Sequence, residues 1–371
     1  MKFSVYTRDL LDALKPVVKC AAIKPMTPIL AAVKITADDR SITFEATDNN
    51  VAASSKIPAN VEAEGAVCVN ARYLLEVANK LPGEVTTFFA AEKFLEVTSE
   101  GSTFDLLIFN VQDFPTPRFP TEPMVPVSKI LFKEMLSKTL FAVAKDEDRP
   151  VFKGVNLATK KTPEGAKVIQ ALATDTSRIA AFLGCYVRGD DTPDFNIVVP
   201  VNPLRTILAE LDDDPECPVY LIPGEHFLAV KFNNFCFKTR LIDGEFPPTD
   251  KVIFFDTQGQ TTFNTKEFKG AIDRAKLVSK QSEYKVVILK ISEGTITVTA
   301  ENEICGRFSQ TVDATCNGEI IIGFNSDYLS DFLNAVGTTK VNLYFNEQYD
   351  PIKMIGVGDE DYLYVVTPVR M

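Results

Sequence analysis

The sequence consists of three successive segments built on one pattern, and this repetition restricts its fold more than any other feature. Each segment opens with a predicted amphipathic helix, at 7–15, 128–140 and 264–275, where a capping residue precedes apolar residues at helical spacing. A period of roughly 120 to 135 residues is too long for a solenoid repeat and suits a duplicated domain. The chain of 371 residues has room for three such domains.

The remainder of each segment also follows a common order. Runs rich in β-branched and aromatic residues predict strands after the first helix, and further strands end the segment. Between them lies a second helix, whose expected cap is Asn70, Asn202 or Asn325, with Pro203 at the first helical position of the middle copy. Each segment is therefore expected to be an α+β unit with two helices packed on antiparallel sheets.

Two proline clusters mark the seams between the segments. They lie at 114–120 and 246–248, and neither a helix nor a central strand should cross them, because proline lacks a backbone donor and restricts its neighbour. We therefore predict domains at 1–126, 127–250 and 251–371.

Positive charge is concentrated in the predicted helices. Segments 5–24, 71–81, 128–145 and 264–280 together carry a formal charge of +9, so the remainder of this chain of net charge −11 carries −20. Such faces could meet phosphates, although ordinary solvated surface helices are the simpler explanation for any one of them. The second helices of the middle and last segments break the pattern, because one is neutral and the other acidic.

Residue patterns typical of catalysis are missing from the sequence. His226 is the only histidine, the seven cysteines form no C-x-x-C pair, and no phosphate-binding glycine loop or zinc-protease motif occurs. We expect no enzyme activity, no metal and no cofactor, while a hydrolase with paired carboxylates stays open because such pairs meet only in the fold. Without a signal peptide or a transmembrane stretch, a cytoplasmic location is expected.

Several short motifs, taken in order, resemble those of one known family along the whole chain. They are KPMTPIL at 24–30, ATD at 46–48, ATDTSRIA at 173–180, LIDGEFP at 241–247 and YVVTPVRM at 364–371. With the three repeats, they are similar to the bacterial DNA polymerase III beta subunit, the beta sliding clamp. The resemblance implies the DNA-clamp fold, with a ring formed by a head-to-tail homodimer, helices lining the hole and sheets outside.

The same resemblance implies a function and a set of partners. A clamp encircles duplex DNA without sequence preference and tethers the replicative polymerase through a peptide-binding pocket between its second and third domains. Expected partners are duplex DNA, a second copy of the chain, the DNA polymerase III alpha subunit, the clamp loader delta subunit, and other polymerases and repair proteins that carry a clamp-binding peptide. No membrane partner is expected.

The resemblance also implies three groups of site residues. Candidate DNA contacts are Lys24, Arg72, Lys80, Lys133, Lys138, Arg149, Lys269 and Lys276. The expected peptide pocket contains Phe152, Gly154, Thr174, Thr176, Ser177, Arg178, Ile179, Pro247, Lys251, Val252, Asn325, Tyr328, Val365, Thr367, Pro368, Val369, Arg370 and Met371. Ring closure is expected to involve Phe104, Leu106, Leu277 and Val278.

The chain departs from the family pattern at the expected pocket. The family usually has Gly-His where this sequence has Thr176-Ser177, and commonly a Met where it has Thr367. Two alternatives accompany this interpretation. One is a diverged second clamp copy with a narrower set of partners, and the other is a β-rich enzyme or scaffold with an accidental repeat.

Overall fold

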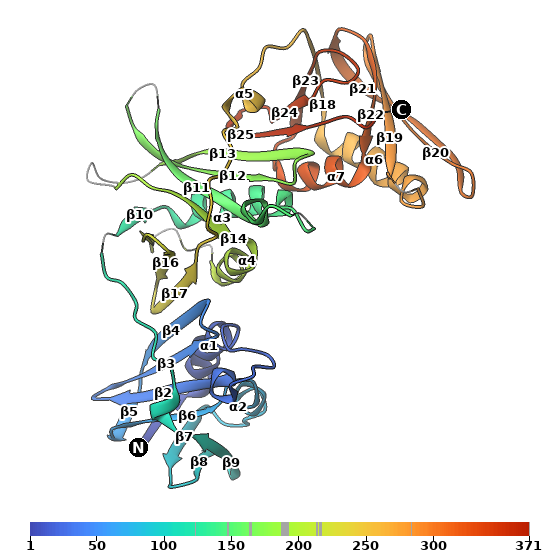
Figure 1. The fold of residues 1–371 in the computed structure, drawn as a ribbon. Coiled ribbons are helices and arrows are strands. Elements are labelled where there is room, and N and C mark those ends of the chain that lie inside the picture. The colour runs from blue at the N-terminus through green and yellow to red at the C-terminus, as the bar shows by residue number, and fades with distance from the viewer. Residues whose placement is uncertain are drawn as a thin grey trace. The chain divides into compact units, whose positions relative to one another are not determined.

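The computed structural model describes residues 1–122, 124–146, 148–162, 165–186, 193–212, 214, 217–282 and 284–370. The chain forms two compact units, each built around one extended antiparallel sheet (Figure 1). The first unit contains Met1–Ile130 and Asn202–Leu241, and the second contains Leu131–Val187, Asp194–Val201 and Ile242–Met371. The middle of the expected three segments therefore contributes to both units.

The three segments share one order of elements. Each has a strand, a helix, three strands, a further strand, a second helix and three closing strands, with one extra strand, β5 (Asn60–Ala63), in the first segment. In the first segment these are β1 (Lys2–Tyr6), α1 (Thr7–Val18), β2 (Ala32–Asp38), β3 (Ser41–Thr47), β4 (Val51–Pro58), β6 (Gly65–Asn70), α2 (Ala71–Ala78), β7 (Val85–Ala90), β8 (Phe94–Ser99) and β9 (Ser102–Phe109).

The second and third segments repeat this order. The second has β10 (Val125–Val127), α3 (Lys129–Thr139), β11 (Gly154–Lys161), β12 (Lys167–Thr174), β13 (Arg178–Tyr186), β14 (Asn196–Pro200), α4 (Val201–Glu210), β15 (Val219–Pro223), β16 (Phe227–Phe232) and β17 (Phe235–Arg240). The third has β18 (Gly259–Asn264), α6 (Thr265–Ser279), β19 (Val286–Ser292), β20 (Thr295–Asn302), β21 (Gly306–Asn317), β22 (Ile320–Asn325), α7 (Ser326–Ala335), β23 (Lys340–Phe345), β24 (Ile352–Gly356) and β25 (Asp359–Val366). A short helix, α5 (Asp250–Ile253), lies between them.

Local sequence explains where most of the helices begin. The side chain of Asn70 accepts a hydrogen bond from the Tyr73 backbone N–H at 2.9 Å, and Asn325 caps α7 in the same way. The middle copy differs, because α4 begins at Val201 and includes Asn202 instead of using it as a cap. Pro203 is tolerated there because the first four N–H groups of a helix have no intrahelical partner.

Strand pairing joins successive segments into continuous sheets. In the first unit, β4 of the first segment pairs with β17, the last strand of the second segment. In the second unit, β13 of the second segment pairs in the same antiparallel way with β25, the last strand of the third. The fourth strand of one segment thus meets the last strand of the next, so the expected boundaries at 126 and 250 do not separate the sheets.

The strands bury one face in the regular alternation expected of antiparallel sheets. Val287, Leu289 and Ile291 of β19 are buried while the residues between them are partly or fully exposed. The helices cover these buried faces, as Phe268 and Ile272 of α6 do. Across the described part of the chain, the helices are too short or too polar to span a membrane.

Candidate functional site

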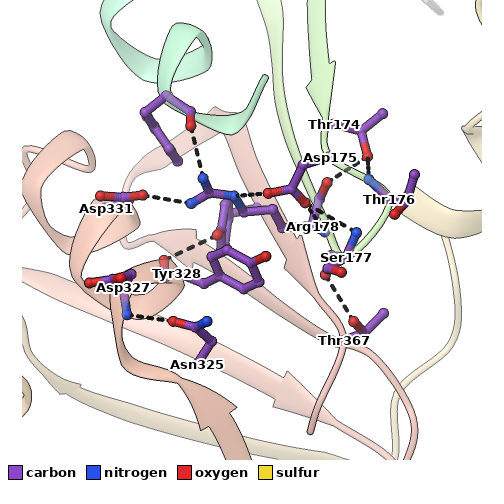
Figure 2. A network of polar contacts seen from close by, with 12 residues as sticks. Thr174, Asp175, Thr176, Ser177, Arg178, Asn325, Asp327, Tyr328, Asp331 and Thr367 are labelled. Carbon is purple, nitrogen blue, oxygen red and sulfur yellow. Dashed lines mark hydrogen bonds and ion pairs between the residues drawn. The ribbon is translucent and has the colours of Figure 1, made fainter. Parts of the chain in front are cut away.

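A tightly bonded loop joins β12 to β13 in the second unit. The hydroxyl of Thr174 donates to the backbone carbonyl of Arg178 at 2.6 Å and accepts from the N–H of Thr176 at 3.1 Å (Figure 2). The carboxylate of Asp175 accepts from the N–H groups of Ser177 and Arg178, both at 3.1 Å. Side chains and backbone together therefore fix the loop, leaving the side chain of Thr176 exposed at its tip.

Arg178 connects this loop to two other elements. Its guanidinium donates to Asp175 at 2.9 Å, to Asp331 of α7 at 2.7 Å and to the carbonyl of Phe141 at 2.9 Å (Figure 2). The guanidinium carbon lies 4.3 Å from the centre of the Tyr328 ring. The donors are thus directed inward, and Arg178 holds the site together instead of extending to a ligand.

Burial and neighbouring groups shift the pKa values of Arg178 and Tyr364. Desolvation acts to lower the pKa of Arg178, but Tyr364 and the hydrogen bond to Asp331 outweigh it and raise that pKa above its ordinary value. Burial raises the pKa of the Tyr364 phenol well above its usual range, and its hydroxyl donates to the carbonyl of Tyr328 at 3.1 Å. The network therefore contains a charged arginine and a neutral tyrosine at physiological pH.

The C-terminal segment is anchored to the same loop. Both the N–H and the hydroxyl of Thr367 donate to the carbonyl of Ser177 at 2.9 Å (Figure 2). The N–H of Val369 donates to the carbonyl of Gly323 at 2.8 Å. Residues 174–178 and 365–370, separated by almost the whole second half of the sequence, therefore meet in one place, as the sequence interpretation expected.

Other expected pocket residues form the apolar base or the rim of this region. Ile179 and Val365 belong to a buried cluster against which Phe246 packs, and the rings of Phe152 and Phe246 meet edge to face at 6.0 Å. Gly154 is required by close packing, because an added Cβ would lie 2.6 Å from the Val199 carbonyl oxygen. The exposed residues of the expected set are Thr176, Lys251, Val252, Thr367 and Arg370, while Pro247, Pro368 and Val369 are half-buried.

Asn325 and Met371 differ from the other residues expected in the pocket. Asn325 accepts a hydrogen bond from the N–H of Asp327 at 2.9 Å, so its side chain is used as the cap of α7. Met371 lies outside the described residues. The sequence interpretation did not include Asp175, Asp331 or Phe141 among the site residues. Asp175 lies inside a motif already singled out, whereas nothing local marks Asp331, which is 153 positions from Arg178.

The candidate DNA contacts differ in how accessible their charges are. Lys24, Arg72 and Lys80 are exposed in the first unit, and Lys269 is half-buried in the second. Within the described part of the chain, none of these four has a carboxylate within ion-pair distance. Lys133 is half-buried, and Arg149 lies over the Phe152 ring, 4.3 Å from its centre.

Two of the expected cations form ion pairs with carboxylates of the protein. Lys138 is buried and bridges Glu134 at 2.6 Å and Asp359 at 2.5 Å, so the structure corrects the expectation that it offers its charge to phosphate. Lys276 pairs with Asp327 at 2.6 Å, and Lys285 pairs with the same carboxylate at 2.7 Å. Although burial would raise the pKa of Asp327, the bonds from these two lysines lower it.

The residues expected at ring closure belong to both units and differ in exposure. Leu277 at the end of α6 is 62% exposed and Val278 is half-buried. On β9, Phe104 is half-buried, but Leu106 is only 1% exposed and belongs to the core of its own unit, whereas Leu107 is 70% exposed. Leu106 is therefore not available at the surface of its unit, contrary to the expectation, because adjacent residues of a strand face opposite sides and the outward one here is Leu107.

Known domain families match the chain in three consecutive pieces. The DNA polymerase III beta subunit N-terminal domain matches residues 1–118, its central domain matches 126–248, and its C-terminal domain matches 251–370. The three matches follow the order of the three repeats and together cover nearly the whole chain.

Individual relatives agree with these matches over their full length. The chain is 26% identical to the beta sliding clamp of Bacillus subtilis over 383 residues, with 100% of both chains covered, and 26% identical to that of Streptococcus pneumoniae, with 99% of both covered. The crystal structure of the Bacillus subtilis DNA polymerase sliding clamp has a TM-score of 0.94 over 100% of this chain and 99% of that one, at 26% identity. The Pseudomonas aeruginosa DNA polymerase III subunit beta shares the fold, with a TM-score of 0.92 at 23% identity and full coverage of both chains.

Proposed function

Because the chain belongs to the DNA polymerase III beta subunit family, we propose that it is a DNA sliding clamp, a non-enzymatic ring that encircles duplex DNA and tethers a DNA polymerase. One observation carries this proposal. All three family domains match in order along the chain, and each repeat has the same sequence of strands and helices. A single-domain likeness would support only a shared fold, whereas the full set supports the shared assembly.

The strand pairing inside the chain supports a head-to-tail dimer. In both described cases, the fourth strand of one segment pairs with the last strand of the next, as β4 does with β17 and β13 with β25. Two strands are left without this pairing among the described strands. They are β21, the fourth strand of the third segment, and β9, the last strand of the first segment. A second copy of the chain supplies the missing partner for each, so two equivalent contacts close a ring.

Both remaining strands have an edge available for such pairing. Residues 102–107 of β9 pair only with β8, and residues 306–313 of β21 pair only with β20, among the strands described here. Unpaired strand edges are templates for a further strand. Phe104, Leu107, Leu277 and Val278 would add apolar area beside them, and a standard stable interface buries about 1,600 Å².

The exposed cations of the helices and nearby loops suit sliding on DNA. Lys24, Arg72, Lys80 and Lys269 are available for phosphate contacts, with Lys133, Arg149 and Lys276 as further members of the proposed set. Contacts of this kind, without base readout, give dissociation constants of only ~10⁻⁴ to 10⁻⁶ M at physiological salt. Long residence on DNA therefore has to come from the closed ring.

The loop at 174–178 and the C-terminal segment supply the proposed partner site. The rigid loop, the apolar base of Ile179 and Val365, and the exposed Val252 suit a short linear peptide with apolar anchors. Proposed partners are the DNA polymerase III alpha subunit, the clamp loader delta subunit, and other polymerases and repair proteins with such a peptide. A cytoplasmic location is part of the same proposal.

The test combines solution mass with retention on DNA. Light scattering is expected to give twice the chain mass of 41.0 kDa. After loading by a clamp loader, the protein should stay on nicked circular DNA and leave when the circle is cut. A monomer, or retention that does not depend on DNA ends, would overturn the proposal.

A further inference from the structure

The first unit contains a cationic pocket of about 430 Å³ beside the start of β4 and the end of β17. Its walls come from the loop at 47–52, the linker at 115–118, the turn at 226–227 and two residues of β17. The charged or titratable side chains in this lining are Arg118, His226, Lys238 and Arg240, and the lining contains no carboxylate.

The lysine and the two arginines of this pocket have no acidic partner in the described chain, while the ring of His226 lies 3.7 Å from the carboxylate of Glu225. The ammonium of Lys238 donates to the carbonyl of Arg118 at 3.0 Å and lies 4.5 Å from the centre of the Phe227 ring. Arg118 and Arg240 are exposed, and neither guanidinium forms an ion pair with a described residue. By contrast, Lys19 in the same unit pairs with Glu210. An unneutralised cationic pocket on a chain of net charge −11 calls for an anionic ligand.

One wall of the pocket, the loop at 47–51, occupies the same place in the first segment as the loop at 174–178 does in the second. Thr47 donates to the carbonyl of Val51 at 2.7 Å and accepts from the N–H of Asn49 at 3.0 Å, and Asp48 accepts from the N–H groups of Asn50 and Val51, both at 2.8 Å. These bonds repeat those of 174–178 one for one. Asn49 and Thr176 also share a positive φ, at 77° and 75°.

The two copies of the loop differ in charge. Val51 occupies the place of Arg178, whose charge is neutralised by Asp175 and Asp331. In the first unit the positive charge comes instead from the linker and from β17, and it faces the pocket. The same loop conformation therefore presents two surfaces of different charge.

We propose that the cationic pocket binds an extended acidic peptide of a partner protein, with successive Asp or Glu residues meeting Arg118, Lys238 and Arg240. A guanidinium can bind a carboxylate through two parallel hydrogen bonds. Single-stranded DNA fits less well, because its bases need open aromatic faces to stack on. Phe227 has the one six-membered aromatic ring in the lining, and Lys238 lies over it, which leaves the imidazole of His226 as the one open aromatic ring there. The proposal does not rest on what the site at 174–178 binds.

The test measures binding of a defined probe to the full-length protein. A fluorescein-labelled octapeptide with four consecutive acidic residues flanked by Ser and Gly is titrated at low salt and followed by fluorescence anisotropy. The double variant Arg118→Ala/Arg240→Ala is expected to weaken binding by about tenfold or more, since it removes two charge-assisted hydrogen-bonded pairs. Lys238→Gln serves as a second variant inside the pocket.

A matched control separates the pocket from general charge. Lys56→Ala/Lys231→Ala removes the same charge from exposed positions of the same unit outside the pocket, and its affinity should stay within about twofold. Equal loss in both double variants, or equal binding of an Asn/Gln version of the peptide, would overturn the proposal. Tighter binding of an eight-nucleotide oligothymidylate, lost in the pocket variant, would replace the peptide with single-stranded DNA. Retention on circular DNA is expected to be unchanged in the pocket variant. Loss of the peptide proposal would therefore leave the clamp proposal intact, and the reverse also holds.

Discussion

The ammonium of Lys129 lies 2.6 Å from Oδ1 of Asp212, and the lysine side chain is fully buried whereas the aspartate side chain is 52% exposed. This pair lies at the start of α3, one of the helices whose positive charge suggested DNA contact. The Lys129 bond lowers the pKa of Asp212. The charge of Lys129 is thus used to anchor the helix, and it does not face solvent.

The unequal burial of this pair predicts unequal effects of mutation. Asp212→Asn leaves a buried ammonium without its counter-charge and should lower the free energy of unfolding by about 1–3 kcal/mol. Lys129→Met replaces a buried cation with an apolar chain of similar length and leaves an aspartate that water can reach, so a change below about 1 kcal/mol is expected. Denaturant unfolding of both variants checks the order, and a larger loss for Lys129→Met would contradict it.

Thr176 has a φ of 75°, a conformation that a β-branched residue rarely adopts. Thr176→Gly should remove this strain and raise the free energy of unfolding of the second unit by about 1 kcal/mol, after the entropic cost of glycine. Because the Thr176 side chain is exposed, little packing is lost. Thr176→Ala is the control and should gain less, since alanine also disfavours this φ. A loss of stability in the glycine variant would show that strain is not the dominant effect.

Arg178 should be irreplaceable by lysine. Lysine keeps the charge but cannot donate at once to Asp175, Asp331 and the Phe141 carbonyl. Arg178→Lys is expected to lower the free energy of unfolding by about 2 kcal/mol, and Arg178→Ala by about 3 kcal/mol or more, because two carboxylates lose their partner. Hydrogen exchange of residues 174–178 should rise in both variants, and unchanged protection there would contradict the structural role.

The Asp327 cluster predicts a loss of stability in acid. Since its folded pKa is lowered, the carboxylate contributes stability above its unfolded pKa of about 3.9, and this contribution disappears as the pH falls through the folded pKa. The difference in free energy of unfolding between the unmodified protein and Asp327→Asn should therefore be constant near pH 7, begin to fall at about pH 4, and vanish only once the pH is below the lowered folded pKa. In a Lys276→Met/Lys285→Met background, the effect of Asp327→Asn on the free energy of unfolding should be much smaller at every pH.

Ring closure through β9 and α6 predicts which surface substitutions give monomers. Leu277→Asp/Val278→Asp should abolish the dimer, and Leu107→Asp should weaken it, because each places a charge in an apolar contact. Val357→Asp, at an exposed turn of the same unit as Leu277, is the control and should remain dimeric. Sedimentation or light scattering over a concentration series distinguishes these outcomes, and an intact dimer in the Leu277/Val278 variant refutes the proposed contact.

Much of the fold could be predicted from local pattern. Helical spacing located both helices of every segment, and asparagine caps marked the starts of α2 and α7, because these signals depend only on neighbouring residues. The motifs around 173–180 and 364–371 also predicted that these two segments lie together. Their contact through Thr367 and Ser177 agrees with that expectation.

The sequence by itself determined the order of elements, the threefold repetition and the family, because periodicity, capping and motif order are properties of the chain alone. Only the tertiary structure decided how the charges and faces are used. It paired Lys138 with Asp359 and Arg178 with Asp331 across more than 150 positions, turned Leu107 outward in place of Leu106, and gathered Arg118, Lys238 and Arg240 around one pocket. The physical reason is that an ion pair or a buried face depends on which distant segment packs alongside, and local spacing carries no information about that partner.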